Sequence, residues 1–162
     1  MRPIHRGKAD RWRAGLEVAY YWHDADVLQV SVSASNGTFT GASFPYLSPG
    51  DLANFASILE GFPTTSSDVR ELEFGAAGEE FAGGYAKLRL SCRDRAGHAV
   101  AEITMESKDQ SRLDTRWIAP VESAHFYAEV EPSAIDEFVK ELRQLSGREE
   151  GSAWLAFRNV SS

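Results

Sequence analysis

Residues 27–37 read VLQVSVSASNG, and this stretch decides the fold class. Polar residues separate its apolar ones, so one face of a strand meets the core and the other meets water. The apolar positions are Leu28, Val30, Val32 and Ala34. Asn36-Gly37 follows, and because both residues tolerate positive φ this pair is the strongest short signal for a hairpin turn. The stretch therefore predicts a half-buried strand that turns back onto an antiparallel neighbour.

The same alternation recurs on both sides of this stretch. Short turn sequences such as Asp94-Arg95-Ala96-Gly97 separate the alternating segments. Strands that follow one another through short turns, rather than alternating with helices, favour an antiparallel sheet. We expect these further strands at residues 16–22, 38–44, 69–74, 85–92, 98–107, 116–121, 124–130 and 153–160.

Two segments instead show the helical spacing of apolar residues. The first begins with Ser48 as the cap, Pro49 at the first helical position and Asp51 as the capping-box acid, and it ends at Gly61. The second begins at Pro132 or Ser133 and ends at Gly147. The two stripes are Leu52, Phe55, Ala56 and Leu59, and Ile135, Phe138, Val139, Leu142 and Leu145.

These segments predict an α+β fold with the order β-β-β-α-β-β-β-β-α-β. We expect a largely antiparallel, curved sheet of about seven strands with two amphipathic helices packed on it. Whether the strands form one sheet or two layers stays open. Residues 1–13 are expected to form a basic flexible arm, and residues 14–162 a single domain.

Composition excludes several classes of protein. The chain has 162 residues, of which 43% are hydrophobic and 25% charged, as in an ordinary globular domain. The single cysteine, Cys92, excludes an intrachain disulfide and a cysteine-based zinc site. No stretch has the roughly 20 apolar residues of a membrane span, and the first residues lack the apolar core of a signal peptide. We therefore expect a cytoplasmic protein without a membrane partner.

Charge is unevenly distributed. The chain carries 17 Lys and Arg residues against 24 Asp and Glu, a formal net charge of −7, although residues 1–13 are basic. An acidic body repels nucleic acid, so we expect no nucleic-acid partner. Two acidic clusters predict a surface for a basic protein, with simple solvation as the alternative. The residues singled out for binding are Asp68, Glu71, Glu73, Glu79, Glu80, Glu129, Asp136 and Glu137.

No sequence motif for catalysis or for a cofactor is present. The four histidines form no metal-binding pair, and a turn explains His23 beside Asp24 and Asp26. Cys92 shares the apolar side of its strand, which favours an inert thiol. Nucleophile-elbow and nucleotide-binding glycine patterns are missing. We therefore expect no metal, no cofactor and no catalytic residue.

Two alternatives to protein binding remain at this stage. A small enzyme could assemble its site from separated residues, and the candidates are His98, His125, Glu102 and Asp94. A carbohydrate- or ligand-binding module could use aromatic side chains on wet faces, and the candidates are Trp12, Tyr21, Trp117 and Tyr127.

The order of several segments resembles a known group of proteins. The segments are Val30–Val32 with Asn36–Gly41, the Leu52–Ala56 helix ending in Gly61-Phe62-Pro63, Leu88–Leu90 with Asp94–His98, and Ile135–Phe138. Over roughly residues 16–145 they resemble small uncharacterised bacterial proteins, some of them similar to WapI-type immunity proteins, which neutralise polymorphic or contact-dependent toxins. The resemblance implies an antiparallel sheet with helices, a bacterial cytosolic setting and a binding role. It transfers no catalytic residue. The favoured prediction is thus a protein-binding module such as a toxin immunity protein, with a basic toxin as partner.

Overall fold

The computed structural model describes residues 13–77, 84–107 and 120–158. Over these residues the chain forms nine strands and two helices, so the α+β class is confirmed. In chain order the elements are β1 (Gly15–His23), β2 (Leu28–Ser35), β3 (Thr40–Ser43), β4 (Tyr46–Leu47), α1 (Asp51–Leu59), β5 (Val69–Gly75), β6 (Tyr85–Cys92), β7 (Ala99–Ser107), β8 (Glu122–Val130), α2 (Pro132–Arg148) and β9 (Ser152–Ala156).

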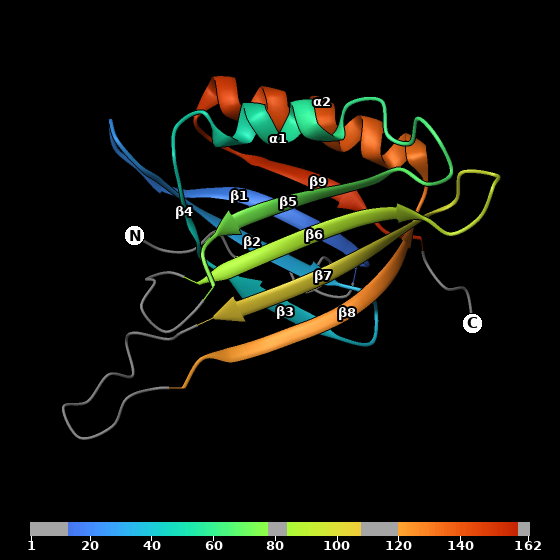
Figure 1. The fold of residues 1–162 in the computed structure, drawn as a ribbon. Helices are drawn as coiled ribbons and strands as arrows, with labels where there is room; N and C mark the ends of the chain where they lie inside the picture. The colour runs from blue at the N-terminus through green and yellow to red at the C-terminus, as the bar shows by residue number, and fades with distance from the viewer. Residues whose placement is uncertain (1–12, 78–83, 108–119, 159–162) are drawn as a thin grey trace.

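The strands form two antiparallel sheets (Figure 1). Sheet A has the order β3-β2-β1-β9, and β4 adds a short pairing to β2. Sheet B has the order β5-β6-β7-β8. The question of one or two sheets, which the sequence left open, is therefore answered by two stacked layers.

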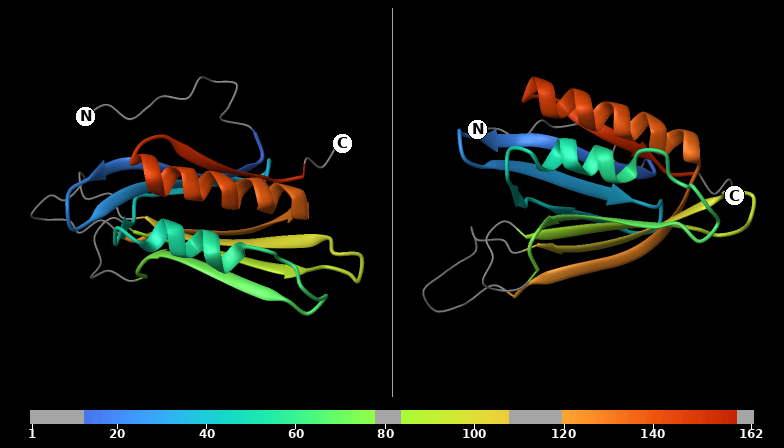
Figure 2. Two further views of the ribbon diagram at one scale, coloured as in Figure 1. Left: turned by 90° about the horizontal axis from the view of Figure 1, so that it is seen from above. Right: turned by 45° about the horizontal axis from the view of Figure 1, so that its top comes forward.

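Both helices lie along the same side of the two sheets, where α1 packs against β5 and α2 against β9 (Figure 2). On the opposite side the sheets approach each other directly, with β3 against β7 and β8. Small residues permit this approach, because a Cβ atom on Gly41 would lie 3.0 Å from Sδ of Met105. Ser43 Oγ also donates a hydrogen bond to the Glu106 carbonyl at 2.8 Å. The molecule is therefore a wedge whose open side is filled by the helices.

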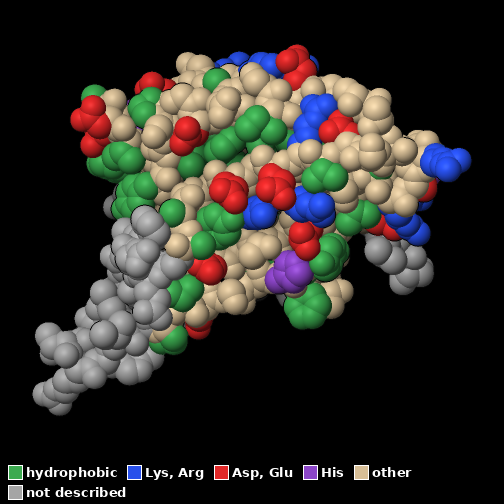
Figure 3. Space-filling view, viewed as in Figure 1, with side chains coloured by type: hydrophobic (Ala, Val, Ile, Leu, Met, Phe, Trp, Pro, Cys, Tyr) green, Lys and Arg blue, Asp and Glu red, His purple; other side chains and the backbone are tan. Residues whose placement is uncertain are grey.

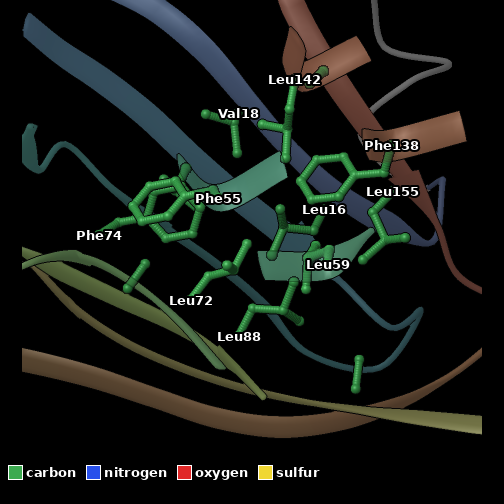
Figure 4. Close-up of a cluster of buried hydrophobic side chains, with 14 of the residues drawn as sticks. Leu16, Val18, Phe55, Leu59, Leu72, Phe74, Leu88, Phe138, Leu142 and Leu155 are labelled. Atoms are coloured by element: carbon green, nitrogen blue, oxygen red, sulfur yellow. The ribbon is translucent and has the colours of Figure 1, made fainter. Parts of the chain in front are cut away.

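The core lies inside this wedge. Side chains from both sheets and both helices meet in one cluster (Figure 4). Phe55 of α1 packs on Phe74 of β5 with ring centroids 4.7 Å apart, and Phe138 of α2 is fully buried. Burying one such side chain contributes about 1.5–3 kcal/mol. The inner faces of both sheets supply this cluster, so the side chains on their outer faces point away from the core.

Two strands differ from the expected ones. Regular alternation along residues 16–22 predicts Trp22 on the same face as Leu16. The register of β1 against β2 instead shifts between Tyr20 and Trp22, and Trp22 is 42% exposed. A β-bulge of this kind reverses the alternation beyond it. The predicted strand 38–44 is shortened to β3, and the short strand β4, which was not predicted, follows after Phe44 and Pro45.

The helix ends also differ from the expected ones. α1 begins at Asp51 without a side-chain cap, and the Asp51 carboxylate instead accepts a hydrogen bond from the Ser48 backbone N–H at 2.8 Å. α2 runs through Gly147 and ends at Arg148, with Glu149 in the left-handed conformation. Neither described helix is long and apolar enough to cross a bilayer.

Two predicted strands extend beyond the described residues. The strand expected at 116–121 lies outside the described residues except for its last two positions, which precede β8. The last strand, β9, is shorter than the expected 153–160, and residues 159–160 are not described. Its buried residues include Ala153 and Leu155, which leaves Trp154 on the outer face of sheet A.

Candidate functional site

The outer face of sheet B carries many charged side chains. We call it the charged face and define it by the outward side chains of β5 to β8. Figure 3 shows carboxylates and cationic side chains mixed there, with a histidine beside them. The defining residues are Glu71, Glu73, Lys87, Arg89, Glu102, Thr104, Glu106, His125, Tyr127 and Glu129.

Strand register aligns these side chains in rows across the sheet. One row runs Glu71, Arg89, Glu102 and Tyr127, each the direct partner of the next. Directly opposed side chains in antiparallel strands lie about 4.5–5.5 Å apart at Cβ, close enough for opposite charges to attract. Accordingly Glu71 lies 3.4 Å from Arg89 Nε and 3.5 Å from Lys87 Nζ.

Glu102 is the centre of a second group of contacts. Tyr127 donates its hydroxyl hydrogen bond to Glu102 Oε2 at 2.8 Å, and His125 Nε2 lies 3.1 Å from the same oxygen. These two hydrogen bonds, that of Tyr127 first, lower the pKa of Glu102, and the carboxylate in turn raises the pKa of the Tyr127 phenol. Glu102 is thus held as an anion in the middle of the charged face.

The remaining carboxylates of the face differ in their partners. Glu129 pairs with Arg93 and lies 3.6 Å from Arg158, so cations offset it. Glu73 instead accepts a hydrogen bond from the Tyr85 hydroxyl at 3.2 Å. Burial, and next the charge of Glu73, raise the pKa of Tyr85 to about 12. Glu73 and Glu102 thus contact Tyr and His side chains, while the strand register also places Lys87 opposite Glu73 and Arg89 opposite Glu102.

The structure distributes the acidic residues predicted for binding over different places. Glu71, Glu73 and Glu129 lie on the charged face. Asp136 and Glu137 lie on the exposed side of α2, a separate surface. Two others, Glu79 and Glu80, lie outside the described residues.

Asp68 has a different environment from the other acidic residues. Its side chain is 13% exposed and lies 2.8 Å from Arg70 Nη2. It also accepts a hydrogen bond from the Thr64 backbone N–H at 2.9 Å. These contacts join Asp68 to the loop between α1 and β5 and to the beginning of β5 itself.

The histidine–carboxylate pairs considered for catalysis do form. His98 Nδ1 lies 2.7 Å from Asp94 in the β6–β7 turn, and His125 contacts Glu102. Both pairs are on open surface, since the two histidine side chains are 49% and 50% exposed. Neither pair lines the three surface cavities, which lie at the start of α1, between α1 and α2, and on sheet A; Glu73 lines the first of them.

The Cys92 thiol and the acidic turn beside His23 provide no further candidate for catalysis or metal binding. Burial, followed by the charges of Asp68 and Asp94, raises the pKa of the Cys92 thiol, which favours the unreactive protonated form. In the part of the chain that the structure describes, no three His, Cys, Asp or Glu side chains gather as a metal site. The Asp24 carboxylate beside His23 accepts hydrogen bonds from the Asp26 and Val27 backbone N–H groups, as expected for a turn.

The aromatic residues considered for ligand binding are divided between the sheets. Tyr127 belongs to the charged face, whereas Tyr21 lines a groove on the outer face of sheet A. Trp12 and Trp117 lie outside the described residues. Phe44 and Trp154 line the same groove and were not predicted as site residues. The alternation in residues 153–156 could have indicated Trp154, because it places Ala153 and Leu155 on one face and Trp154 on the other.

Comparisons of the chain with protein-family models, with curated proteins and with solved structures found no match.

Proposed function

We propose that this protein is a protein-binding module that docks a basic partner protein on the charged face, and that the partner is a toxin which it neutralises. The observation that carries the proposal is the open outer face of sheet B, because both helices and sheet A lie on its inner side. The resemblance to WapI-type immunity proteins supplies the class of partner.

Charge favours a basic partner. The charged face holds five glutamates against two cations, and the whole chain has a net charge of −7. Such a field speeds the encounter with a positively charged protein and disfavours acidic ones. A toxin that acts on nucleic acid has a basic active-site surface, which this face would complement.

Side-chain chemistry favours Glu73 on the edge strand β5 and Glu102 on the inner strand β7 as the anchors. Among the described residues no Lys or Arg forms a salt bridge with Glu73 or Glu102, although Lys87 and Arg89 lie opposite them across the sheet, so both carboxylates can accept cations from a partner. Tyr127, which donates its hydroxyl hydrogen bond to Glu102, is 54% exposed, and tyrosine is enriched at interfaces. Arginine side chains of the partner could pair with the carboxylates and stack on this ring.

The size of the face is compatible with this role. Its strands have seven to nine residues. With strands about 4.8 Å apart and a rise of about 3.3 Å per residue, four of them cover on the order of 500 Å² in projection. The accessible area of such a side-chain surface exceeds its projection, which brings it near the roughly 800 Å² that one partner contributes to a standard interface.

The test uses the protein encoded by the reading frame next to this gene, purified and titrated calorimetrically. We expect the double variant Glu73→Lys/Glu102→Lys to raise Kd at least about tenfold, since each reversal replaces an attraction by a repulsion. The control is Asp136→Lys/Glu137→Lys, which changes the net charge equally but on α2. It should alter Kd by less than about threefold.

Three results would contradict the proposal. The first is no association of the wild-type protein and no protection of cells that express the neighbouring protein. The second is an equal loss of affinity in both double variants, which would indicate a long-range charge effect. The third is a loss confined to the α2 variant, which would move the interface to that helix.

A further inference from the structure

The outer face of sheet A, on the other side of the molecule from the charged face, carries a groove of about 390 Å³. We infer that this groove binds a small, flat aromatic molecule without net charge that carries a hydrogen-bonding group on its edge. This ligand site is independent of the protein-docking role proposed above.

The floor of the groove is made of short side chains. Ser152 of β9, Ala19 of β1 and Ser31 of β2 are direct neighbours across the sheet. None of these side chains rises far above the sheet, so they form a trough. A flat ring system can lie in this trough, whereas a bulky branched molecule cannot approach the strands as closely.

Aromatic side chains stand at both ends of the trough. Trp154 is the cross-strand neighbour of Glu17 at one end. Tyr21 is at the other, four residues further along β1 and thus about 13 Å away, and it packs on Phe44 with ring centroids 5.3 Å apart. Aromatic walls favour aromatic ligands, because offset-stacked and edge contacts add to the area buried.

The Trp154 wall is fixed in place by close packing. A Cβ atom on Gly15 would lie 2.2 Å from Cζ2 of this indole, so the ring occupies the space that any other residue at position 15 would need. The backbone N–H of Trp154 also donates a hydrogen bond to Glu141 of α2 at 2.7 Å. A wall that is already ordered loses little entropy when a ligand binds.

The charges at the groove offset each other. Arg13 and Glu17 both line the Trp154 end, and the Arg13 guanidinium lies 5.0 Å from the indole centroid. One cation and one anion together favour neither an anionic nor a cationic ligand. The hydroxyls of Ser31 and Ser33, which also line the groove, can instead bond a polar group on the edge of a neutral ligand.

The volume of the groove limits the ligand. Small-molecule sites range over about 300–1,000 Å³, and this groove is near the lower limit. It therefore suits a molecule of two or three fused rings.

The test uses 2-naphthol as a neutral, flat probe and follows the backbone amide shifts of the full-length protein by NMR. For a probe of this size on an open groove we expect weak binding, with a Kd of about 1 mM. Shifts should be confined to β1, β2, β3 and β9. Naphthalene-2-sulfonate and 2-naphthylmethylammonium serve as the charged comparisons.

Variants decide whether the probe lies in the trough. Ser31→Phe fills the floor of the trough, and we expect it to raise the Kd of 2-naphthol about tenfold. At about 1 mM probe, the amide shift changes should then fall about fivefold. Ser152→Phe fills the trough from β9 and should have the same effect. This second variant keeps the test valid if Ser31→Phe fails to fold. The control, Thr104→Phe, adds the same ring to the central strand β7 of sheet B and should leave binding unchanged.

Several results would overturn the inference. These are shifts outside sheet A, no shifts at all, or equal binding by the wild type and both filled variants. Binding of either charged probe at least tenfold tighter than 2-naphthol would show that the ligand is not neutral. A dimer in light scattering that Ser31→Phe dissociates would show that a second copy of the chain covers the groove. Failure here leaves the docking test unaffected, because the two tests use opposite faces.

Discussion

Arg70 and Asp68 together close the end of helix α1. Arg70 Nη1 donates to the carbonyls of Ile58 and Glu60 at 3.0 and 2.6 Å, and Arg70 Nη2 lies 2.8 Å from Asp68. The last carbonyls of a helix have no partner within it, so this guanidinium satisfies groups that would otherwise need water. The Asp68 carboxylate holds the guanidinium in this position.

We predict that Asp68→Asn lowers the free energy of unfolding by about 1–3 kcal/mol at pH 7, because it removes a charged hydrogen bond that is mostly shielded from solvent. Hydrogen bonds, with that from Arg70 first, lower the pKa of Asp68 from its ordinary value of 3.8. Because the pKa of Asp68 is lowered on folding, its contribution to the free energy of unfolding is complete above pH 3.8. The contribution is lost as the pH falls through the lowered pKa of the folded protein.

Urea unfolding of wild type and variant at several pH values measures this difference. The two curves should converge below about pH 4. A difference that stays constant down to pH 2, or one that grows in acid, would contradict the assigned role. Glu73→Gln is the control, because the hydrogen bond to its carboxylate comes from Tyr85 and not from Arg70.

Sequence alone could not separate Asp68 from Glu71 and Glu73. All three have the same charge and lie within six residues of each other. What distinguishes Asp68 is its contact with an arginine that reaches back ten and twelve residues to α1. Contacts of this kind depend on how the helix and strand pack, which local periodicity does not encode.

At the scale of elements, the free edge of β8 receives hydrogen bonds from two distant parts of the chain. Asn36 Nδ2 donates to the Tyr127 carbonyl at 2.9 Å, and the Arg158 backbone N–H donates to the Glu129 carbonyl at 2.8 Å. Unpaired strand edges invite pairing with other chains. These two bonds occupy part of the edge and join the β2–β3 hairpin of sheet A to sheet B.

We predict that Asn36→Ala lowers the free energy of unfolding by about 1–2 kcal/mol, because Asn36 Oδ1 also accepts hydrogen bonds from the Thr38 and Phe39 backbone N–H groups within the turn. Asn36→Asp should retain the turn bonds and lose only the bond to β8, with an intermediate effect. Chemical unfolding measures both variants. Equal stability of Asn36→Ala and the wild type would show that the turn does not depend on this side chain.

The elements show where sequence reasoning succeeds. Val30 and Val32 are buried as the alternation in β2 predicts, and Phe138 is buried as the helical stripe predicts. Errors occurred where a single residue changes the geometry. The β-bulge near Tyr21 exposes Trp22, and α2 continues through Gly147 because glycine permits a helix end without requiring one.

At the scale of the whole molecule, the wedge turns one face of each sheet inward and leaves two outer faces of different character. Sheet B presents charge, and sheet A presents a groove with aromatic ends. Part of this division could be predicted, since Glu71, Glu73, Glu102 and His125 were all singled out from the sequence. To place these residues on one face, the register of four strands must be known. Turn sequences indicate only which consecutive strands form hairpins.

The most direct test of the docking proposal is cross-saturation NMR on the complex with the protein encoded by the neighbouring reading frame. We predict that saturating the partner attenuates signals of the outward side chains of β6, β7 and β8, with Tyr127 among the most affected. The groove on sheet A and the exposed side of α2 should keep their intensity. Attenuation centred on Asp136 and Glu137, or on Trp154, would contradict the assignment of the charged face as the docking surface.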